Sequence, residues 1–241
     1  MSDVPMMEGL LLVNKPSGVT SHDVVDVVRR QVHLRRIGHT GTLDPMAQGL
    51  LILLLGSSTK RQGEFQAHDK TYEALLRLGT QTDTGDATGS VIRRAPIPTL
   101  TSPHVTAVMT SMIGPLSQIP PTFSAVKVHG RPAYWWARRH HPVTLRPRTV
   151  QLFELALGRL TCDTIDFRAR CSAGTYLRSI AEVIAERLGT VGHLASLTRL
   201  RIGDWTVDQA MPLSWLADAT SEQIGQRIVP LEPHHAPARR G

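Results

Sequence analysis

The sequence predicts a mixed α+β fold with a basic insertion. In some segments apolar residues recur at helical spacing, whereas in others they alternate with polar residues or form short continuous runs, as in strands. The two kinds of segment are interspersed along 241 residues, with no internal repeat and no clear linker. A chain of this length can bury a full core. We therefore predict one large domain over residues 9–210, an insertion at about residues 120–148, and a short tail over residues 211–241.

Strands are expected where the apolar pattern has a period of two or no polar break. Within residues 71–79, Tyr72, Ala74 and Leu76 occupy every second position, so their side chains would lie on one face of a strand. Residues 50–55 form a continuous apolar run, which is typical of a buried strand. Residues 82–89 are rich in Asp, Thr and Gly, which indicates a turn-rich link. The other expected strands cover residues 9–14, 90–93, 149–157, 164–171 and 194–202.

Helices are expected where capping residues precede a helical pattern. Residues 21–32 carry valines at helical spacing, and Thr20 with Asp23 resembles a capping box. Thr175 is expected to cap a second amphipathic helix that stops at Gly189. Shorter helices are expected from Pro103 to Gly114 and over residues 133–139.

The charge indicates a polyanionic partner. The formal net charge is +7 and the pI is near 10.1. Basic residues gather before residue 38 and again over residues 127–148, where Tyr134, Trp135 and Trp136 lie among arginines. Arginines pair with phosphates and aromatic rings stack on unpaired bases, so this segment favours RNA. A solvated basic helix whose aromatic residues face the core is the alternative.

Several classes of site find no support in the sequence. The longest apolar run, residues 50–55, is too short to span a bilayer, and no signal-peptide pattern opens the chain. Cys162 and Cys171 form neither a disulfide framework nor a metal-binding spacing. No P-loop, dinucleotide-binding glycine pattern or zinc signature is present. We therefore expect a cytoplasmic protein that needs no cofactor and no metal.

Asp44 lies in the most informative segment of the chain. Residues 38–49 contain three glycines around this single carboxylate. Pro45 pushes Asp44 toward an extended backbone, while Gly38 and Gly41 allow a partner to approach the main chain closely. A rigidly held acid on an open loop is suited to a functional site. A connection whose Asp merely caps a turn is the alternative.

Six segments follow one another in an informative order. They are residues 14–21 (NKPSGVTS), 38–45 (GHTGTLDP), 70–72 (KTY), 82–84 (TDT), 171–178 (CSAGTYLR) and 197–200 (LTRL). Together they resemble the TruB family of tRNA pseudouridine synthases, which convert the uridine at tRNA position 55, in the T loop. The resemblance covers almost all of residues 9–210. It implies a mainly antiparallel sheet with flanking helices, in which residues 120–148 are a thumb-like insertion that grips RNA.

The resemblance also implies roles for individual residues. Asp44 would be the catalytic carboxylate, Arg178 would pair with it, and Tyr72 would stack against the flipped uracil. The residues expected to line the pocket or contact the RNA are Tyr176, Leu197 and His39.

The residues fit this chemistry independently of the family. The reaction breaks the N-glycosidic bond and rejoins the uracil through C5, without redox change or phosphate transfer. The target lies inside a folded RNA, so the base must be flipped out. Asp44 would act as a nucleophile on either the ring or the sugar, and the sequence leaves both routes open. The resemblance implies the T stem-loop of tRNA as partner, and we expect no protein partner and a monomer.

Two other functions are weighed against this interpretation. A non-catalytic RNA-binding or tRNA-folding protein would show the same basic surface, but it would not require Asp44, Tyr72 and Arg178 together. An acid protease is suggested only by residues 83–85 (DTG), which lack the apolar strand and the second copy that such a site needs.

Asn14 and Gln48 depart from the family pattern, and the tail is too short for the additional RNA-binding domain that many members carry.

Overall fold

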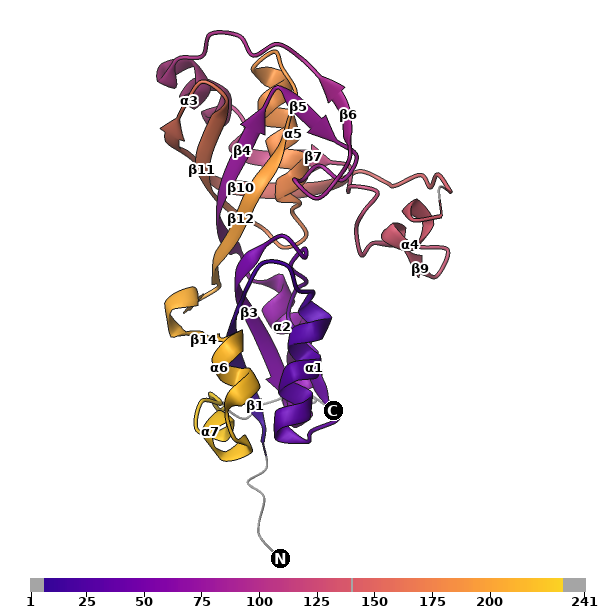
Figure 1. Ribbon diagram of the computed structural model, residues 1–241, viewed down its shortest axis with the longest axis vertical. Coiled ribbons are helices and arrows are strands. Elements are labelled where there is room, and N and C mark those ends of the chain that lie inside the picture. Colours follow the sequence, from indigo (N-terminus) through magenta and orange to yellow (C-terminus); the bar gives the residue numbers. More distant parts are fainter. Residues whose placement is uncertain (1–6, 140, 232–241) are drawn as a thin grey trace, which may run out of the picture. The chain divides into compact units, whose positions relative to one another are not determined.

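The computed structural model describes residues 7–139 and 141–231, which form two compact units (Figure 1). Unit 1 comprises residues 7–45, 49–66 and 206–231 of the described chain, and unit 2 comprises residues 46–48 and the described part of 67–205. The described part of the tail belongs to unit 1, whereas residues 232–241 lie outside the described residues. A single domain over residues 9–210 stays a prediction.

Unit 1 is a small sheet covered by helices. Its strand order is β14-β1-β3-β2, with β1 parallel to β14 and antiparallel to β3. Its elements are β1 (Gly9–Lys15), α1 (Ser21–Val32), β2 (Ile37–His39), β3 (Gln48–Leu55), the 3₁₀ helix η1 (Gly56–Arg61), α2 (Gln62–Ala67), the 3₁₀ helix η2 (Val207–Gln209), β14 (Met211–Pro212), α6 (Leu213–Asp218) and α7 (Ser221–Gly225).

The core of unit 1 joins segments from both ends of the chain. Leucines of β3 are buried against the valines of α1, and Leu216 of α6 is fully buried in the same cluster. The predicted capping box of α1 is confirmed, since the Asp23 N–H donates to Thr20 Oγ1 (3.1 Å) and the Thr20 N–H donates to Asp23 Oδ2 (2.8 Å). The hydrogen bond from the Thr20 N–H, and a second from the Thr20 hydroxyl to the same Oδ2 (2.8 Å), lower the pKa of Asp23. The described part of the tail therefore packs by its apolar residues on the core of unit 1.

Unit 2 is a larger antiparallel sheet in the order β12-β4-β11-β10-β7. Its elements are β4 (Lys70–Leu78), β5 (Thr80–Thr82), β6 (Val91–Arg94), α3 (Ser102–Thr110), β7 (Gly114–Gln118), β8 (Lys127–Val128), β9 (Arg131–Pro132), α4 (Ala133–Ala137), β10 (Arg148–Leu160), β11 (Thr164–Cys171), α5 (Leu177–Arg187), β12 (Gly192–Ile202) and β13 (Trp205–Thr206). β5 pairs with β6 and β8 pairs with β9 outside this sheet.

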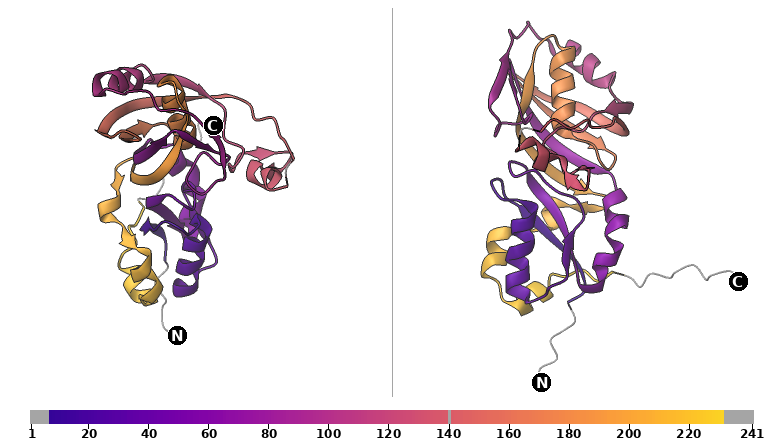
Figure 2. Two further views of the ribbon diagram at one scale, coloured as in Figure 1. Left: turned by 45° about the horizontal axis from the view of Figure 1, so that its top comes forward. Right: turned by 90° about the vertical axis from the view of Figure 1, so that its right-hand side faces the viewer.

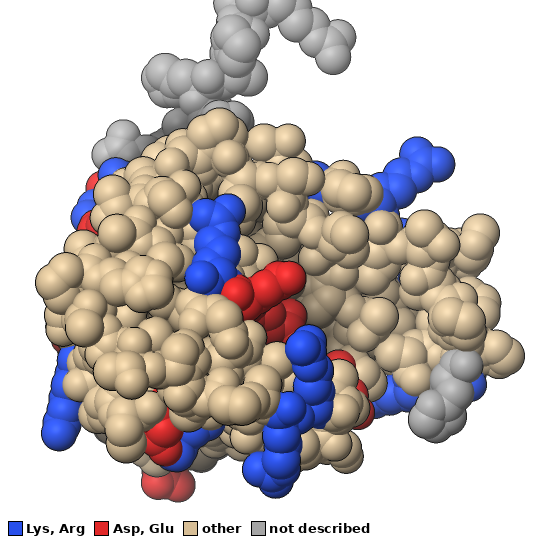
Figure 3. Space-filling model, turned by 90° about the horizontal axis from the view of Figure 1, so that it is seen from above, with Lys and Arg blue, Asp and Glu red and all other residues tan. Residues whose placement is uncertain are grey.

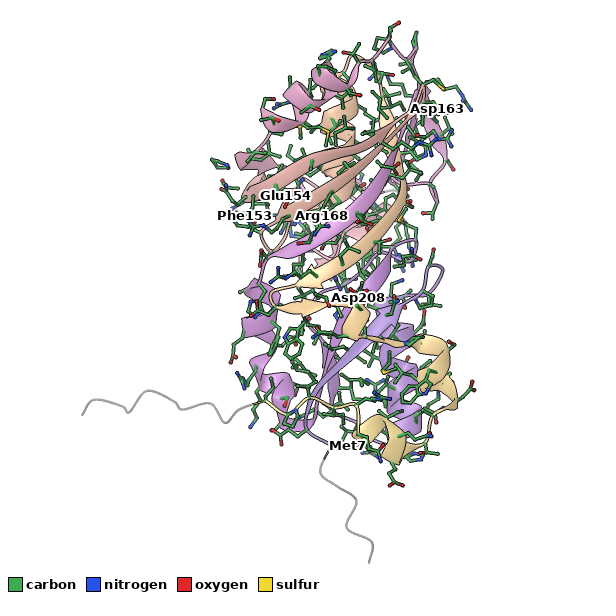
Figure 4. The ribbon with its side chains drawn as sticks, turned by 90° about the vertical axis from the view of Figure 1, so that its left-hand side faces the viewer. Met7, Phe153, Glu154, Asp163, Arg168 and Asp208 are labelled. Carbon is green, nitrogen blue, oxygen red and sulfur yellow. The ribbon has the colours of Figure 1, made fainter. Side chains whose placement is uncertain are left out.

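The two faces of this sheet differ. Helices α3 and α5 contact each other and pack on β10 and β12, so they share one face (Figure 2). The opposite face carries Phe153, Glu154 and Arg168 (Figure 4), and the Arg168 guanidinium lies 3.9 Å from the Glu154 carboxylate. The register shifts between Leu152 and Glu154, and this bulge lets both Leu152 and Leu155 face the core.

The predicted cap of the second long helix is wrong. The N-cap of α5 is Tyr176, whose side chain makes no capping hydrogen bond. The hydroxyl of Thr175 donates instead to the carbonyl of Ser172 (2.9 Å), within the turn that precedes the helix. The predicted stop is confirmed, because Gly189 follows the C-cap and has a φ of 80°, which glycine adopts without strain.

Candidate functional site

The loop that carries Asp44 is anchored on both sides of the carboxylate. Asp44 is partly buried in the irregular segment between β2 and β3. On one side, the Leu43 N–H donates to Ser21 Oγ (2.9 Å), and the same hydroxyl lies 3.3 Å from the Leu43 carbonyl. On the other side, the Pro45 carbonyl accepts from the Gly18 N–H (2.8 Å). The backbone of Asp44 is therefore held between two hydrogen-bonded neighbours.

Lys15 completes this anchor from the interior of unit 1. Its side chain is fully buried at the end of β1, and Nζ donates to the carbonyls of Pro16 (2.9 Å), Val19 (2.7 Å) and Pro45 (3.3 Å). A buried ammonium needs such acceptors, because burying it without them is very costly. Lys15 thus links residues 15–19 to the loop beside Asp44. Lys15 belongs to residues 14–21, one of the six segments that carry the family resemblance, but the sequence alone indicated no role for it.

His39 lies in the same unit, at the end of β2, and is half-buried. Its carbonyl accepts a hydrogen bond from Gln62 Nε2 (2.8 Å) of α2. The strand that leads into the Asp44 loop is therefore also tied to the helix beyond β3.

In unit 2, Tyr72 and Leu197 lie on neighbouring strands and share a face. Tyr72 pairs with Arg199, and Ala74 pairs with Leu197, in the antiparallel ladder of β4 and β12. Residues opposite each other, and residues two apart on one strand, point to the same face of a sheet. Tyr72, Leu197 and Arg199 are all buried. The structure thus gives Tyr72 both an aliphatic and a cationic neighbour.

Arg178 is buried in the first turn of α5. Its Nη1 donates to the Thr84 carbonyl and its Nη2 to the Phe123 carbonyl, both at 2.8 Å. Its Nε lies 3.8 Å from Oδ2 of Asp86, and both side chains are at least 94% buried. The guanidinium is therefore fixed in direction by two other segments of unit 2, around residues 84–86 and at Phe123. The pairing of Arg178 with Asp44 that the resemblance implies stays a prediction.

Asp86 is a site residue that the sequence analysis missed. It lies in the segment interpreted as a turn-rich link, yet it is 5% exposed. Its Oδ1 accepts from the hydroxyls of Thr84 (2.8 Å) and Thr88 (2.6 Å) and from the Thr88 N–H (3.0 Å). The signal that could have identified it is the Thr-x-Asp-x-Thr pattern, in which flanking hydroxyls can hold a carboxylate.

The buried thiol of Cys171 is not suited to nucleophilic attack. Burial raises the pKa of Cys171 to about 11, so the thiol stays protonated near neutral pH. Its cross-strand neighbour Lys70 has its pKa lowered to about 8, first by burial and then by the charge of Arg199. A carboxylate is therefore a better candidate for the nucleophile than this cysteine.

The insertion joins β7 to β10. The turn between β8 and β9 has positive φ at His129 (48°) and Gly130 (76°), as a tight hairpin requires. The Arg139 guanidinium lies 3.8 Å from the Trp135 ring centroid, and Trp136 Nε1 donates to the Val128 carbonyl (3.0 Å). Two tryptophans are thus engaged inside the insertion, while its arginines are mostly exposed. Binding of RNA by this segment stays a prediction.

One face of the molecule carries acidic as well as basic side chains. Viewed from above, acidic side chains form a central patch, and Lys and Arg side chains lie around it (Figure 3).

Comparison with known proteins decides the family. A model described as TruB family pseudouridylate synthase (N terminal domain) matches residues 29–177. A tRNA pseudouridine synthase B from Opitutus terrae is 40% identical over 93% of either chain. This chain belongs to the TruB family. Its relative from Thermobifida fusca, with the same name, is 43% identical over 88% of this chain and 75% of its own length.

Solved structures agree with this membership. The chain is similar to one in a Cbf5-Nop10-Gar1 complex, with a TM-score of 0.71 and 26% identity over 93% of this chain. A second, from an archaeal box H/ACA sRNP Nop10-Cbf5 complex, has a TM-score of 0.69 at 24% identity, which shows the fold. The present chain covers 60% and 62% of the length of those two chains. The predicted α+β pseudouridine synthase fold is confirmed.

Asp86→Asn should destabilise the protein by about 3 kcal/mol, because it removes a buried negative charge from beside a buried guanidinium. The measurement is urea unfolding at neutral pH. Asp163→Asn is the matched control. Its carboxylate pairs with Arg77 (2.6 Å), but both side chains are more than 40% exposed, so its loss should cost less than about 1 kcal/mol. An equal loss of unfolding free energy in the two variants would contradict the larger contribution of the buried Asp86 carboxylate to stability.

Proposed function

We propose that this protein isomerises uridine 55 in the T loop of tRNA to pseudouridine. The observation that carries the proposal is the partly buried Asp44, held on both sides by hydrogen bonds in a chain of the TruB family. Relatives that are about 40% identical over most of the chain are named tRNA pseudouridine synthase B. A fixed carboxylate is the group that this reaction requires.

In the proposed mechanism, the uridine is flipped out of the T loop and held in a pocket. Asp44 attacks as the nucleophile, on either the uracil ring or the ribose. The N1–C1′ bond breaks, a C5–C1′ bond forms with release of Asp44, and the proton lost from C5 is balanced by one gained at N1. Arg178 pairs with Asp44, which favours the charged carboxylate and fixes its direction. Tyr72 stacks on the uracil through its ring.

The remaining residues would enclose the base. Leu197 and Tyr176 line the pocket and limit the access of water, which protects a covalent intermediate from hydrolysis. His39 contacts the RNA where the base leaves the stack. No redox change or phosphate transfer takes place, so the reaction needs no cofactor.

The arginine-rich insertion is the proposed grip on the T stem-loop. Its exposed guanidinium groups suit backbone phosphates, and the half-exposed Tyr134 offers a ring to RNA.

We further propose that the protein acts as a monomer in the cytoplasm. Over residues 7–139 and 141–231, no helix is both long enough and apolar enough to cross a membrane.

A non-catalytic RNA-binding or tRNA-folding protein is the alternative. Such a protein would need the insertion, but it would not need an anchored carboxylate. The substitution of Asp44 therefore separates the two functions.

Asp44→Asn should abolish pseudouridine formation and leave tRNA binding within a few-fold. The amide keeps the shape of the side chain and removes the nucleophilic charge, so the rate should fall by more than about a hundredfold. The measurements are single-turnover pseudouridine formation and filter binding of a tRNA transcript. Asp204→Asn is the control, since its carboxylate is fully exposed and its rate should stay within about twofold. An active Asp44→Asn protein would rule out Asp44 as the nucleophile.

Replacing Arg131, Arg138 and Arg139 together with Gln should flatten the salt dependence of RNA binding. Each lost phosphate contact should lower the slope of log K against log salt by about 0.7 to 0.9, giving a decrease of about 2 to 3. The measurement is a salt titration of binding to a T-arm hairpin. The control replaces Arg159, Arg168 and Arg170, an equal change of charge on β10 and β11. An equal loss of slope in the control would move the RNA grip away from the insertion.

A further inference from the structure

The two residues that bound the insertion both contact Tyr176. Gln118 is the last residue of β7 and Arg148 is the first residue of β10, and they pair directly opposite each other in the antiparallel ladder. The insertion leaves the sheet after Gln118 and returns to it at Arg148. Both ends of the proposed RNA grip are therefore fixed beside one tyrosine.

Gln118 holds the backbone of Tyr176. Its side chain is 4% exposed, its Oε1 accepts from the Tyr176 N–H (2.8 Å), and its Nε2 donates to the Tyr176 carbonyl (3.1 Å). A single amide thus satisfies both main-chain groups of the residue that precedes α5. Because Tyr176 makes no side-chain cap, these two hydrogen bonds fix the point from which its ring projects.

Arg148 holds the ring itself. The centre of its guanidinium lies 4.7 Å from the centroid of the Tyr176 ring, within the range of a cation–π contact. Its Nε and Nη2 are buried and donate to no acceptor in the described part of the chain. The ring face is therefore the electrostatic partner that offsets the burial of this guanidinium, and the attraction aligns the ring with it.

We propose that Gln118 and Arg148 are positioning residues that hold Tyr176 in place for the isomerisation. This inference rests on the proposed function, in which Tyr176 lines the uracil pocket. Because both residues lie at the base of the insertion, RNA bound there would tighten the same contacts that place the tyrosine. Small displacements of a group that contacts the reacting base cost much of the rate.

The position of Tyr176 can be measured without RNA. The chain has three tyrosines, so protein labelled with 3-fluorotyrosine gives three fluorine signals, each assigned by a Tyr→Phe substitution. Gln118→Met and Arg148→Met should each shift or broaden the Tyr176 signal and leave those of Tyr72 and Tyr134 unchanged. Gln151→Met, a half-buried position on β10, is the matched control and should change none of them.

The consequence for the reaction is measured by single-turnover kinetics on a T-arm hairpin. Gln118→Met should lower the rate by about 10- to 100-fold, while the Kd stays within about threefold. Arg148→Met should behave in the same way, and Arg148→Lys should recover part of the rate because it keeps the cation. Gln151→Met should stay within about twofold. The melting temperature is measured in parallel.

The outcomes separate the two proposals. An unchanged Tyr176 signal, or an unchanged rate well below the melting temperature, would overturn the positioning role. If Gln118→Met does not fold, Arg148→Met carries the same test. If the unsubstituted protein forms no pseudouridine, the proposed function fails instead, and the fluorine signals still show whether the two residues hold Tyr176.

Discussion

The buried ammonium of Lys15 is the interaction on which the proposed nucleophile depends. It joins carbonyls of residues 16 and 19 to the carbonyl of Pro45, the residue that follows Asp44. Water cannot replace these acceptors at a fully buried position, so the loop cannot move without leaving a buried charge poorly solvated. Rigidity at Asp44 is thereby derived from the core of unit 1 rather than from the glycine-rich loop.

Unit 2 achieves rigidity by a different arrangement. Arg178 is held by two carbonyls and by the carboxylate of Asp86, which is itself held by the hydroxyls of Thr84 and Thr88. A guanidinium with several fixed acceptors keeps its direction, which is what the proposed pairing of Arg178 with Asp44 requires. Both units thus use a buried cation to fix groups that the family motifs contain.

The sequence predicts what depends on local pattern. The capping box at Thr20, the valines of α1 and the alternation around Tyr72 each follow from neighbours in the chain, and the structure confirms the helix and the strand. Gln118 was missed because its partner Tyr176 lies far away in sequence, and the ion pair of Asp86 with Arg178 leaves no local signal for the same reason. The cap at Thr175 was wrong because its hydroxyl donates back to the Ser172 carbonyl, a local alternative that the pattern does not distinguish from a cap. Gln118 and Tyr176 are 58 residues apart, and Arg178 and Thr84 are 94 apart, distances at which spacing carries no signal.

The most direct test of the proposed function is chemical mapping of pseudouridine in an unmodified tRNA transcript incubated with the purified protein alone. The protein should form a single new pseudouridine, at position 55, without added cofactor. A transcript that is bound but stays unmodified would contradict catalysis and favour an RNA-binding protein. Pseudouridine at another position would keep the chemistry and contradict the proposed target.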